Sequence, residues 1–170
     1  METQTLKALQ DPLKDRYREE PTAALVTLRA HGSLGDGISC SVATGRAIAE
    51  AGLHPASGGD GTLLCSGDML LEALAACAGV TLRAVATSIG VEIRGGSVET
   101  EGDLDFRGTL AVAKDALVGF RAIRLRFILD TDATDDELDT LLRLTERYCV
   151  VYQTLATAPE LSVTRATSFP

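Results

Sequence analysis

The stretch SGDMLLEALAACAGVTLRAVATSIG, residues 66–90, decides the fold of this chain. About 23 residues at a rise of 1.5 Å each predict a helix of roughly 35 Å that is apolar on nearly every side. Ser66 is the predicted N-cap, Asp68 in the first turn faces the positive end of the helix dipole, and Gly90 is the predicted stop. A helix of this kind must be surrounded, so we expect a central core helix enclosed by a sheet and by a partner.

The composition of the whole chain predicts a single domain. The 170 residues are 45% hydrophobic and 24% charged, with no Trp, so Leu, Val, Ile and Ala must build the core. A chain of this length buries a sufficient core without disulfide staples. We therefore expect one domain over residues 1–170, with residues 1–20 as an N-terminal helical extension.

The charge pattern and the apolar runs exclude two classes of partner. A net charge of −8 repels a phosphate backbone, which predicts no nucleic-acid binding. The N-terminus, METQTLKALQDPLKDRYREE, has no apolar signal segment. The longest apolar run, residues 69–93, is interrupted by Glu72, Arg83 and Glu92, which predicts no membrane span. The protein is therefore expected to be soluble and cytoplasmic.

Outside the central helix, the first half of the chain predicts a helix and a hairpin. Residues 4–20 are amphipathic at helical spacing, and Pro12 leaves open a division of this helix into two pieces. AALVTLRAH, residues 23–31, alternates as a strand, and ISCSVAT, residues 38–44, is the returning strand after the turn GSLGDG, residues 32–37.

The next part of the chain predicts β structure. VEIRGGSVET, residues 91–100, and DLDFRGTLAVAK, residues 103–114, are two expected strands, with Gly95 and Gly96 marking a bulge or bend. FRAIRLRFIL, residues 120–129, alternates with four apolar side chains directed inward: Ile123, Leu125, Phe127 and Leu129.

The C-terminal part predicts a helix followed by a strand. Thr134 and Glu137 form a capping box before the helix DDELDTLLRLTERY, residues 135–148. The apolar stripe of this helix directs Cys149 toward the core. ELSVTRAT, residues 160–167, is the expected last strand.

Four cysteines are the main candidates for chemistry. Their spacings contain no close C-x-x-C pair, which predicts no metal site. Structural disulfides are not expected in a cytoplasmic chain. Cys40 alternates with Val42 and is expected to pack in a strand. Cys65 is expected to be a buried turn residue, with an accessible thiol just before the central helix as the alternative.

Cys77 and Cys149 belong to two separate predicted core helices. Small side chains surround Cys77 on its helix, which leaves room for another element or a ligand to approach the sulfur. A thiolate stabilised by a nearby positive charge attacks a peroxide to give a sulfenic acid, which a second thiol condenses into a disulfide. Cys149 is the natural second thiol. The alternative is that both are buried packing residues.

The residues around both cysteines add to this interpretation. SGDMLLEALAACAG, residues 66–79, resembles the S-P-x-E-L-L-L-A-A-L-A-A-C signature of the OsmC/Ohr family of hydroperoxide-reducing proteins. RYCVVYQTL, residues 147–155, is similar to the family's second motif, and the resemblance covers residues 21–168. It implies an α+β fold in which an antiparallel sheet wraps around two central helices of an intertwined homodimer, with active sites at the dimer interface.

The resemblance also implies an activity. It implies a thiol-dependent peroxidase that reduces hydroperoxides, organic ones included, and protects against oxidative stress. Cys77 would be the peroxidatic cysteine and Cys149 the resolving one, and an external dithiol would reduce their disulfide. Asp68 matches the family's acidic catalytic residue. No bound cofactor and no metal are implied.

Three positions depart from the family pattern. Asp68 is shorter than the usual Glu, and nine residues of continuous helix place it opposite Cys77, so it would act by orienting an Arg or across the dimer. Val150 replaces a common Pro, and Tyr152 stands where a polar side chain is frequent. These departures keep two alternatives open, a non-catalytic dimer that binds a small ligand and a redox-sensing dimer.

Two further candidates have no assigned role. One is the Arg by which the family holds its thiolate, and the other is a histidine. The open candidates for the Arg are Arg16, Arg18, Arg29 and Arg46. His54, in the loop AGLHPASGGDGT, is a weak candidate for a functional residue because loops often carry function.

Overall fold

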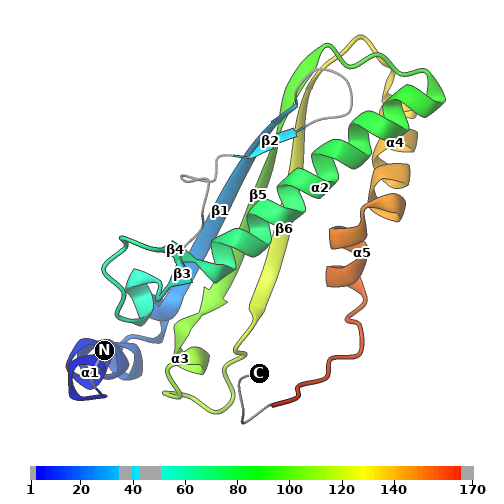
Figure 1. Ribbon diagram of the computed structural model, residues 1–170. Coiled ribbons are helices and arrows are strands. Elements are labelled where there is room, and N and C mark those ends of the chain that lie inside the picture. The colour runs from blue at the N-terminus through cyan, green and yellow to red at the C-terminus, as the bar shows by residue number, and fades with distance from the viewer. Residues whose placement is uncertain (1–2, 35–39, 43–50, 166–170) are drawn as a thin grey trace, which may run out of the picture.

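A four-stranded antiparallel sheet of order β2-β1-β5-β6 carries a long helix, α2, across one face (Figure 1). The computed structural model describes residues 3–34, 40–42 and 51–165. The elements are α1 (Thr3–Glu19), η1 (Pro21–Ala24), β1 (Leu25–Leu34), β2 (Cys40–Val42), β3 (Ala51–Gly52), η2 (Pro55–Ser57), β4 (Leu64–Cys65), α2 (Ser66–Ile89), β5 (Gly95–Asp105), α3 (Phe106–Thr109), β6 (Phe120–Asp130), α4 (Asp135–Tyr148) and α5 (Val150–Ala156).

The sheet joins strands from both halves of the chain. β1 pairs antiparallel with β5 from Leu25↔Asp105 to Ser33↔Ser97, and β5 pairs antiparallel with β6. β2 returns antiparallel to β1, as predicted. The expected turn is wrong over residues 32–34, which extend β1 and pair with β2, and residues 35–37 lie outside the described residues. The α+β architecture with an antiparallel sheet is therefore confirmed.

Helix α2 is the core element that the sequence predicts. Its inner side is buried against the sheet and α4 by eight residues: Leu71, Leu74, Ala75, Ala78, Gly79, Leu82, Val85 and Ala86. Gly90 ends the helix in the left-handed region at φ 77°, and its N–H donates to the Ala86 carbonyl, as predicted. The N-cap prediction is wrong by one residue. Cys65 is the N-cap, because β4 pairs with β3 as far as Cys65 and the chain enters the helix directly afterwards.

The outer side of α2 remains partly uncovered. Within the described part of the chain, α2 is the one helix whose length and composition would suffice to cross a membrane. Its inner side is instead buried in the core, and its outer side exposes Leu70 and Val80, each by 38%.

The N-terminal helix α1 is one continuous helix through Pro12, so it is not divided into two pieces. Tyr17 is buried, and its hydroxyl donates to the Ala56 carbonyl over 2.6 Å. Gln10 donates to the Ser57 carbonyl over 3.2 Å. These contacts attach the predicted helical extension to η2.

The segment between α2 and β6 differs from its prediction. One strand, β5, replaces the two expected strands, and residues 91–94 precede it. The second expected strand becomes α3 after Asp105, because the Asp105 carboxylate accepts the Arg107 N–H and pairs with its guanidinium at 2.6 Å. The irregularity in the β5–β6 pairing lies between Asp103 and Leu104 rather than at the glycines.

The C-terminal half is predicted well as far as α4. β6 alternates as expected, with its arginines exposed and Ile123, Leu125, Phe127 and Leu129 half-buried. The capping box of α4 is present, with Thr134 and Glu137 in their predicted roles. The expected last strand is wrong over residues 160–165, which form no strand and are exposed, and residues 166–167 lie outside the described residues.

Gly96 is the glycine on which the β5–β6 pairing depends. Its φ is 147°, and a Cβ at this position would meet the carbonyl oxygen of Ile128. Gly96→Ala should therefore lower the free energy of unfolding by about 2 kcal/mol, measured by urea denaturation. Gly95→Ala is the matched control, because no heavy atom lies within 4 Å of its Cβ, and it should change stability by less than about 0.5 kcal/mol. Equal effects of the two substitutions would contradict this account.

Candidate functional site

Cys77 and Cys149 meet where α2 passes the junction of α4 and α5. Cys149 is fully buried in a cluster with Leu74, Ala75 and Val98, and the half-exposed Cys77 packs against this cluster. Both thiols are free, and the Cys149 thiol is hydrogen-bonded to the Cys77 sulfur. The structure thus brings together the two cysteines that the sequence singles out.

The local backbone explains why Cys149 reaches this position. Its N–H donates to the Thr145 carbonyl over 2.9 Å, which closes α4, and its extended φ and ψ of −73° and 109° then turn the chain. Its Sγ accepts the Tyr152 N–H over 3.5 Å, which opens α5. Cys149 is therefore both the C-cap of one helix and the N-cap of the next.

The surroundings of Cys77 favour its thiolate. Burial alone raises the pKa of the Cys77 thiol, but four hydrogen bonds outweigh it and hold the pKa below its ordinary value. The donors, in decreasing effect, are the Val151 N–H, the Cys149 thiol, the Thr81 hydroxyl and the Val150 N–H. Hydrogen bonds to the charged form of a group stabilise that form.

Cys149 has the opposite tendency. The pKa of its thiol is raised to about 11, chiefly by burial and in part by the neighbouring Cys77, while the Tyr152 N–H opposes the shift. Cys77 is therefore the member of the pair that ionises first, and Cys149 stays a neutral thiol that donates to it. A thiol that ionises more readily is the better nucleophile of a pair.

The sequence alone identifies the two cysteines but not the hydrogen-bond donors that lower the pKa of Cys77. Thr81 lies one helical turn after Cys77, and that spacing was the available signal for its hydroxyl. Two further donors are the backbone N–H groups of Val150 and Val151, and nothing in the identity of these residues indicates that role. Val150 occupies the first position of α5, where Pro is often found, and its N–H is a donor that Pro lacks.

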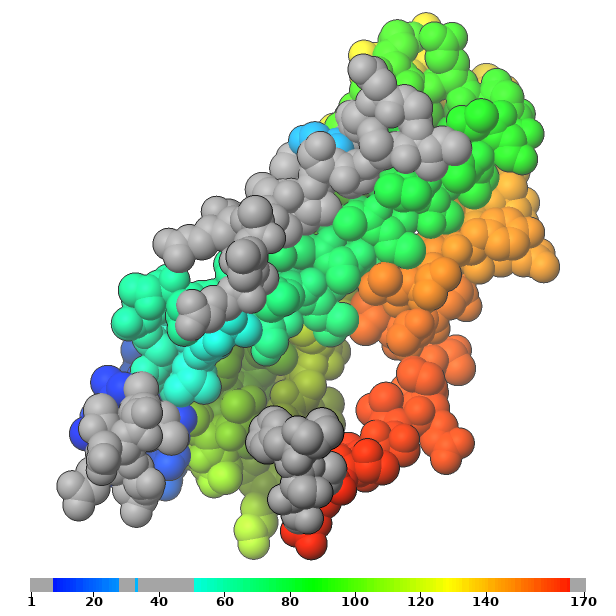
Figure 2. Space-filling model, in the orientation of Figure 1, coloured from blue at the N-terminus to red at the C-terminus, as the bar shows by residue number. Residues whose placement is uncertain are grey.

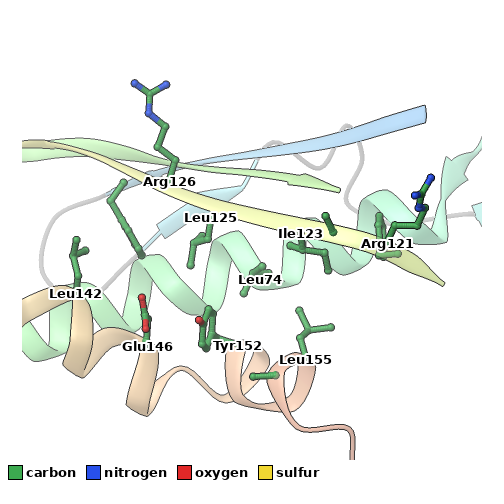
Figure 3. A pocket seen from close by; sticks show the side chains of 13 residues that line it. Leu74, Arg121, Ile123, Leu125, Arg126, Leu142, Glu146, Tyr152 and Leu155 are labelled. Atoms are coloured by element: carbon green, nitrogen blue, oxygen red, sulfur yellow. The ribbon is translucent and has the colours of Figure 1, made fainter. Parts of the chain in front are cut away.

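Two apolar hollows flank the thiol pair. One, of about 560 Å³, lies between α2 and α4 and is lined by Val80, Thr81 and Tyr148 among others, so the hydroxyl that contacts Cys77 borders it. The other, of about 640 Å³, lies between β6 and α4–α5 (Figure 3). Leu74 and Tyr152 line it and also pack in the Cys149 cluster.

Asp68 is not part of the thiol pair within one subunit. It lies in the first turn of α2 and Cys77 follows nine residues later in the same continuous helix, which places the two side chains on opposite faces. Burial raises the pKa of Asp68, and the charge of His54 lowers it. Glu72, one turn later, also has a raised pKa, through burial and through the charge of Asp68.

His54 and Cys65 have structural surroundings. The His54 ring stacks on Phe106 with 5.0 Å between ring centroids, and its Nδ1 accepts the Ala56 N–H over 3.0 Å. Cys65 is half-exposed as the N-cap of α2, so the expectation of a buried turn residue is wrong. The backbone of Cys40 belongs to β2, while its side chain lies outside the described part.

Two of the four candidate arginines, Arg16 and Arg18, lie on α1 and away from the thiols. Arg18 pairs with Asp15 at 2.5 Å on α1, and Arg16 precedes it on the same helix, which packs against η2 and α3. The side chain of Arg29 and all of Arg46 lie outside the described residues. Across the described residues, no three His, Cys, Asp or Glu side chains gather as metal ligands would.

Comparisons with known proteins find a matching family model and a solved structure of similar fold. The family model described as OsmC-like protein matches residues 59–164, a range that includes α2 and both cysteines. The crystal structure of an OsmC-like hydroperoxide resistance protein from Jannaschia sp. CCS1 has a similar fold, with a TM-score of 0.62. The similarity covers 86% of this chain and 97% of the other at 16% sequence identity. No curated protein matches this chain significantly.

The hydrogen bonds to Cys77 predict how substitutions move its ionisation. Cys149→Ala removes a donor and should raise the pKa of Cys77, whereas Cys149→Ser keeps a donor and should raise it less. Thr81→Val should also raise it, because the valine has no hydroxyl. The rate of Cys77 alkylation against pH, followed by peptide mass spectrometry, measures each value. A profile that all three variants leave unchanged would contradict the assigned donors.

Proposed function

This chain belongs to the OsmC-like protein family, and on that premise we propose that it is a thiol-dependent peroxidase that reduces hydroperoxides. The observation that carries the proposal is the pairing of Cys77, whose pKa is lowered, with Cys149, whose pKa is raised, in one contact. A site with one ionised and one neutral thiol suits two successive sulfur reactions. Protection against oxidative stress is the corresponding role in the cell.

The first step oxidises Cys77. Its thiolate attacks the terminal oxygen of a hydroperoxide ROOH, so a sulfur–oxygen bond forms and the oxygen–oxygen bond breaks. The leaving alkoxide takes a proton from water and departs as the alcohol ROH, and Cys77 becomes a sulfenic acid. The donors from Val150, Val151 and Thr81 hold the thiolate for this attack.

The second step joins the two sulfurs. Cys77 as a thiolate contributes to the raised pKa of Cys149, and a neutral sulfenic acid no longer does so. Cys149 thus loses its proton more readily after the first step than before it. Its sulfur attacks the Cys77 sulfur, the sulfur–oxygen bond breaks and water leaves. An external dithiol then reduces the disulfide by two exchanges and is itself oxidised to a disulfide.

The substrate is proposed to carry an apolar group. The hollow between α2 and α4 begins at Thr81, next to Cys77, and its other lining residues are mainly apolar: Val80, Ala84, Val85, Ser88, Ile89, Leu144 and Tyr148. An organic hydroperoxide would bury its hydrocarbon part there with the peroxide group at the sulfur. No bound cofactor is needed in this scheme.

The assembly and the compartment are part of the same proposal. The exposed apolar side of α2, with Leu70 and Val80, would be covered by a second copy in a homodimer, which would also enclose the half-exposed Cys77. Reduced, reactive thiols suit the cytoplasm, where dithiol reductants are present.

Single cysteine substitutions test the two steps. Cys77→Ser should abolish the consumption of cumene hydroperoxide in the presence of dithiothreitol. Cys149→Ser should stop at the sulfenic acid of Cys77, detectable with dimedone by mass spectrometry, and should form no intramolecular disulfide. Cys65→Ser is the matched control and should keep turnover within about twofold of the unaltered chain.

Undiminished peroxide consumption by the Cys77→Ser variant would contradict the proposal. Thiols that stay unmodified at every peroxide concentration would favour a ligand-binding dimer. Oxidation once per subunit without turnover would favour a redox sensor.

Asp68 enters the proposal as a positioning residue that acts through another group, either an arginine or the second subunit. Asp68→Asn should then raise the pKa of Cys77 and lower peroxide turnover by about tenfold. Glu72→Gln is the control, because Glu72 is also an acid near the start of α2 with a raised pKa. If Asp68→Asn lowers thermal stability and leaves the Cys77 ionisation profile unchanged, Asp68 only stabilises the start of the helix.

A further inference from the structure

Helix α5 lies at the surface and has little packing of its own. Figures 1 and 2 show it on the outside of the molecule, beyond the end of α4 and beside α2. It has seven residues, Val150–Ala156, and none of them is buried. Every residue of the segment that follows, 157–165, is exposed as well. A helix this short is not stable by itself in water, so α5 depends on the groups that hold its first turn.

The two cysteine sulfurs are the groups that hold this turn. The first N–H groups of a helix have no acceptor within the helix and need one from outside it. In α5 the Val150 N–H donates to the Cys77 sulfur, and the Tyr152 N–H donates to the Cys149 sulfur over 3.5 Å. The Val151 N–H contributes a hydrogen bond to each sulfur. The acceptors of the first turn are therefore the two sulfurs of the proposed reaction.

Oxidation changes these acceptors. In the reduced pair Cys77 ionises readily, and a thiolate accepts a stronger hydrogen bond than a neutral sulfur does. The Cys77–Cys149 disulfide carries no charge, and its covalent bond draws together two sulfurs that are hydrogen-bonded in the reduced pair. The first turn of α5 then keeps its donors and loses its charged acceptor. The redox state of the sulfurs thus controls the stability of α5.

The buried position of Cys149 matters for the reduction of this disulfide. When a thiolate attacks a disulfide, the sulfur whose thiol has the lower pKa leaves faster. In this pair that sulfur belongs to Cys77, so attack at the Cys149 sulfur is favoured. Cys149 is fully buried, however, in a cluster against which Val151 and Tyr152 of α5 pack. An external dithiol reaches this sulfur only if α5 moves away.

We infer that α5 is a redox-dependent gate, whose first turn opens when the Cys77–Cys149 disulfide forms and admits the external dithiol to the Cys149 sulfur. The inference rests on the disulfide of the proposed function. The sulfur–sulfur bond breaks, Cys77 leaves as a thiolate, and a mixed disulfide joins Cys149 to the reductant. The second thiol of the reductant loses its proton and attacks the reductant's own sulfur in this bond. The reductant departs as a disulfide, Cys149 takes up a proton, and α5 closes over the reduced pair.

Hydrogen exchange tests the opening. In a full-length chain carrying Cys40→Ser and Cys65→Ser, diamide converts the remaining pair to the disulfide and dithiothreitol returns it to thiols. Mass spectrometry with fragmentation of the peptides follows exchange at the amides of residues 150–152. We expect these amides to exchange at least about tenfold faster in the disulfide form, because they lose a charged acceptor. The amides of residues 141–147 in α4 should change by less than about twofold.

Adding Cys77→Ser to the same chain provides the control for the oxidant. This variant forms no disulfide between the two positions, so diamide should leave the exchange of its α5 amides unchanged. Equal exchange of the disulfide and dithiol forms at residues 150–152 would overturn the gate and leave the peroxidase proposal standing. If diamide forms no disulfide, the gate and the second peroxidase step both fail. A disulfide that opens α5 but that cumene hydroperoxide does not form would support the gate and contradict the peroxidase.

Val150→Pro tests the cap itself. Pro suits the first position of a helix, and the extended backbone of Cys149, with φ −73° and ψ 109°, suits the residue before it. Pro has no N–H to lose its acceptor. The disulfide should therefore accelerate exchange at residues 151 and 152 by a factor about threefold smaller than in Val150→Ala, the matched variant that keeps the N–H. An equal factor in the two variants would overturn the role of the cap.

Trapping of the mixed disulfide locates the attack. The disulfide form is mixed with glutathione, quenched within seconds with N-ethylmaleimide and digested for peptide mass spectrometry. We expect glutathione on Cys149 together with N-ethylmaleimide on Cys77, in at least about fivefold excess over the reverse arrangement. Glutathione found mainly on Cys77 would overturn the attack at Cys149.

Discussion

The packing of α2 against the sheet and α4 is the constraint on which the candidate site depends. Leu71, Leu74 and Leu82 are fully buried on the inner side of this helix, and their burial fixes its rotation. That rotation places Cys77 at the border between the buried and the exposed side. Its sulfur then meets the α4–α5 junction, while the side chain remains partly exposed.

The two cysteines differ because their surroundings differ. Cys77 is half-exposed and receives four donors, whereas Cys149 is completely buried and receives two backbone N–H groups, from Tyr152 and Val151. Desolvation opposes a buried thiolate, and hydrogen bonds to sulfur favour an exposed one. The same contact therefore lowers one pKa and raises the other, and in the proposed peroxidase reaction this difference sets the order of the two sulfur steps.

Periodic patterns predicted the elements that have one buried face. The apolar run of α2, the alternation of β6 and the Thr134–Glu137 capping box all appear as expected. The segment around α3 could not be predicted in this way, because the interaction of Asp105 with Arg107 overrides an alternating pattern. The family resemblance implied that the two cysteines lie close together. The backbone N–H donors at Val150 and Val151 could not be predicted, because valine side chains give no indication of them.

The order of elements along the chain determines when α2 becomes covered during synthesis. β1 precedes α2 and β5 follows it, yet these strands are neighbours in the sheet, with Leu25 opposite Asp105. The sheet that covers α2 therefore cannot close until the ribosome has synthesised β5. Throughout that interval only β1 and β2, of the strands in this sheet, are available to cover a helix apolar enough to span a membrane. Folding is thus delayed by long-range pairing, and we expect the nascent chain to depend on chaperones that keep α2 from aggregating.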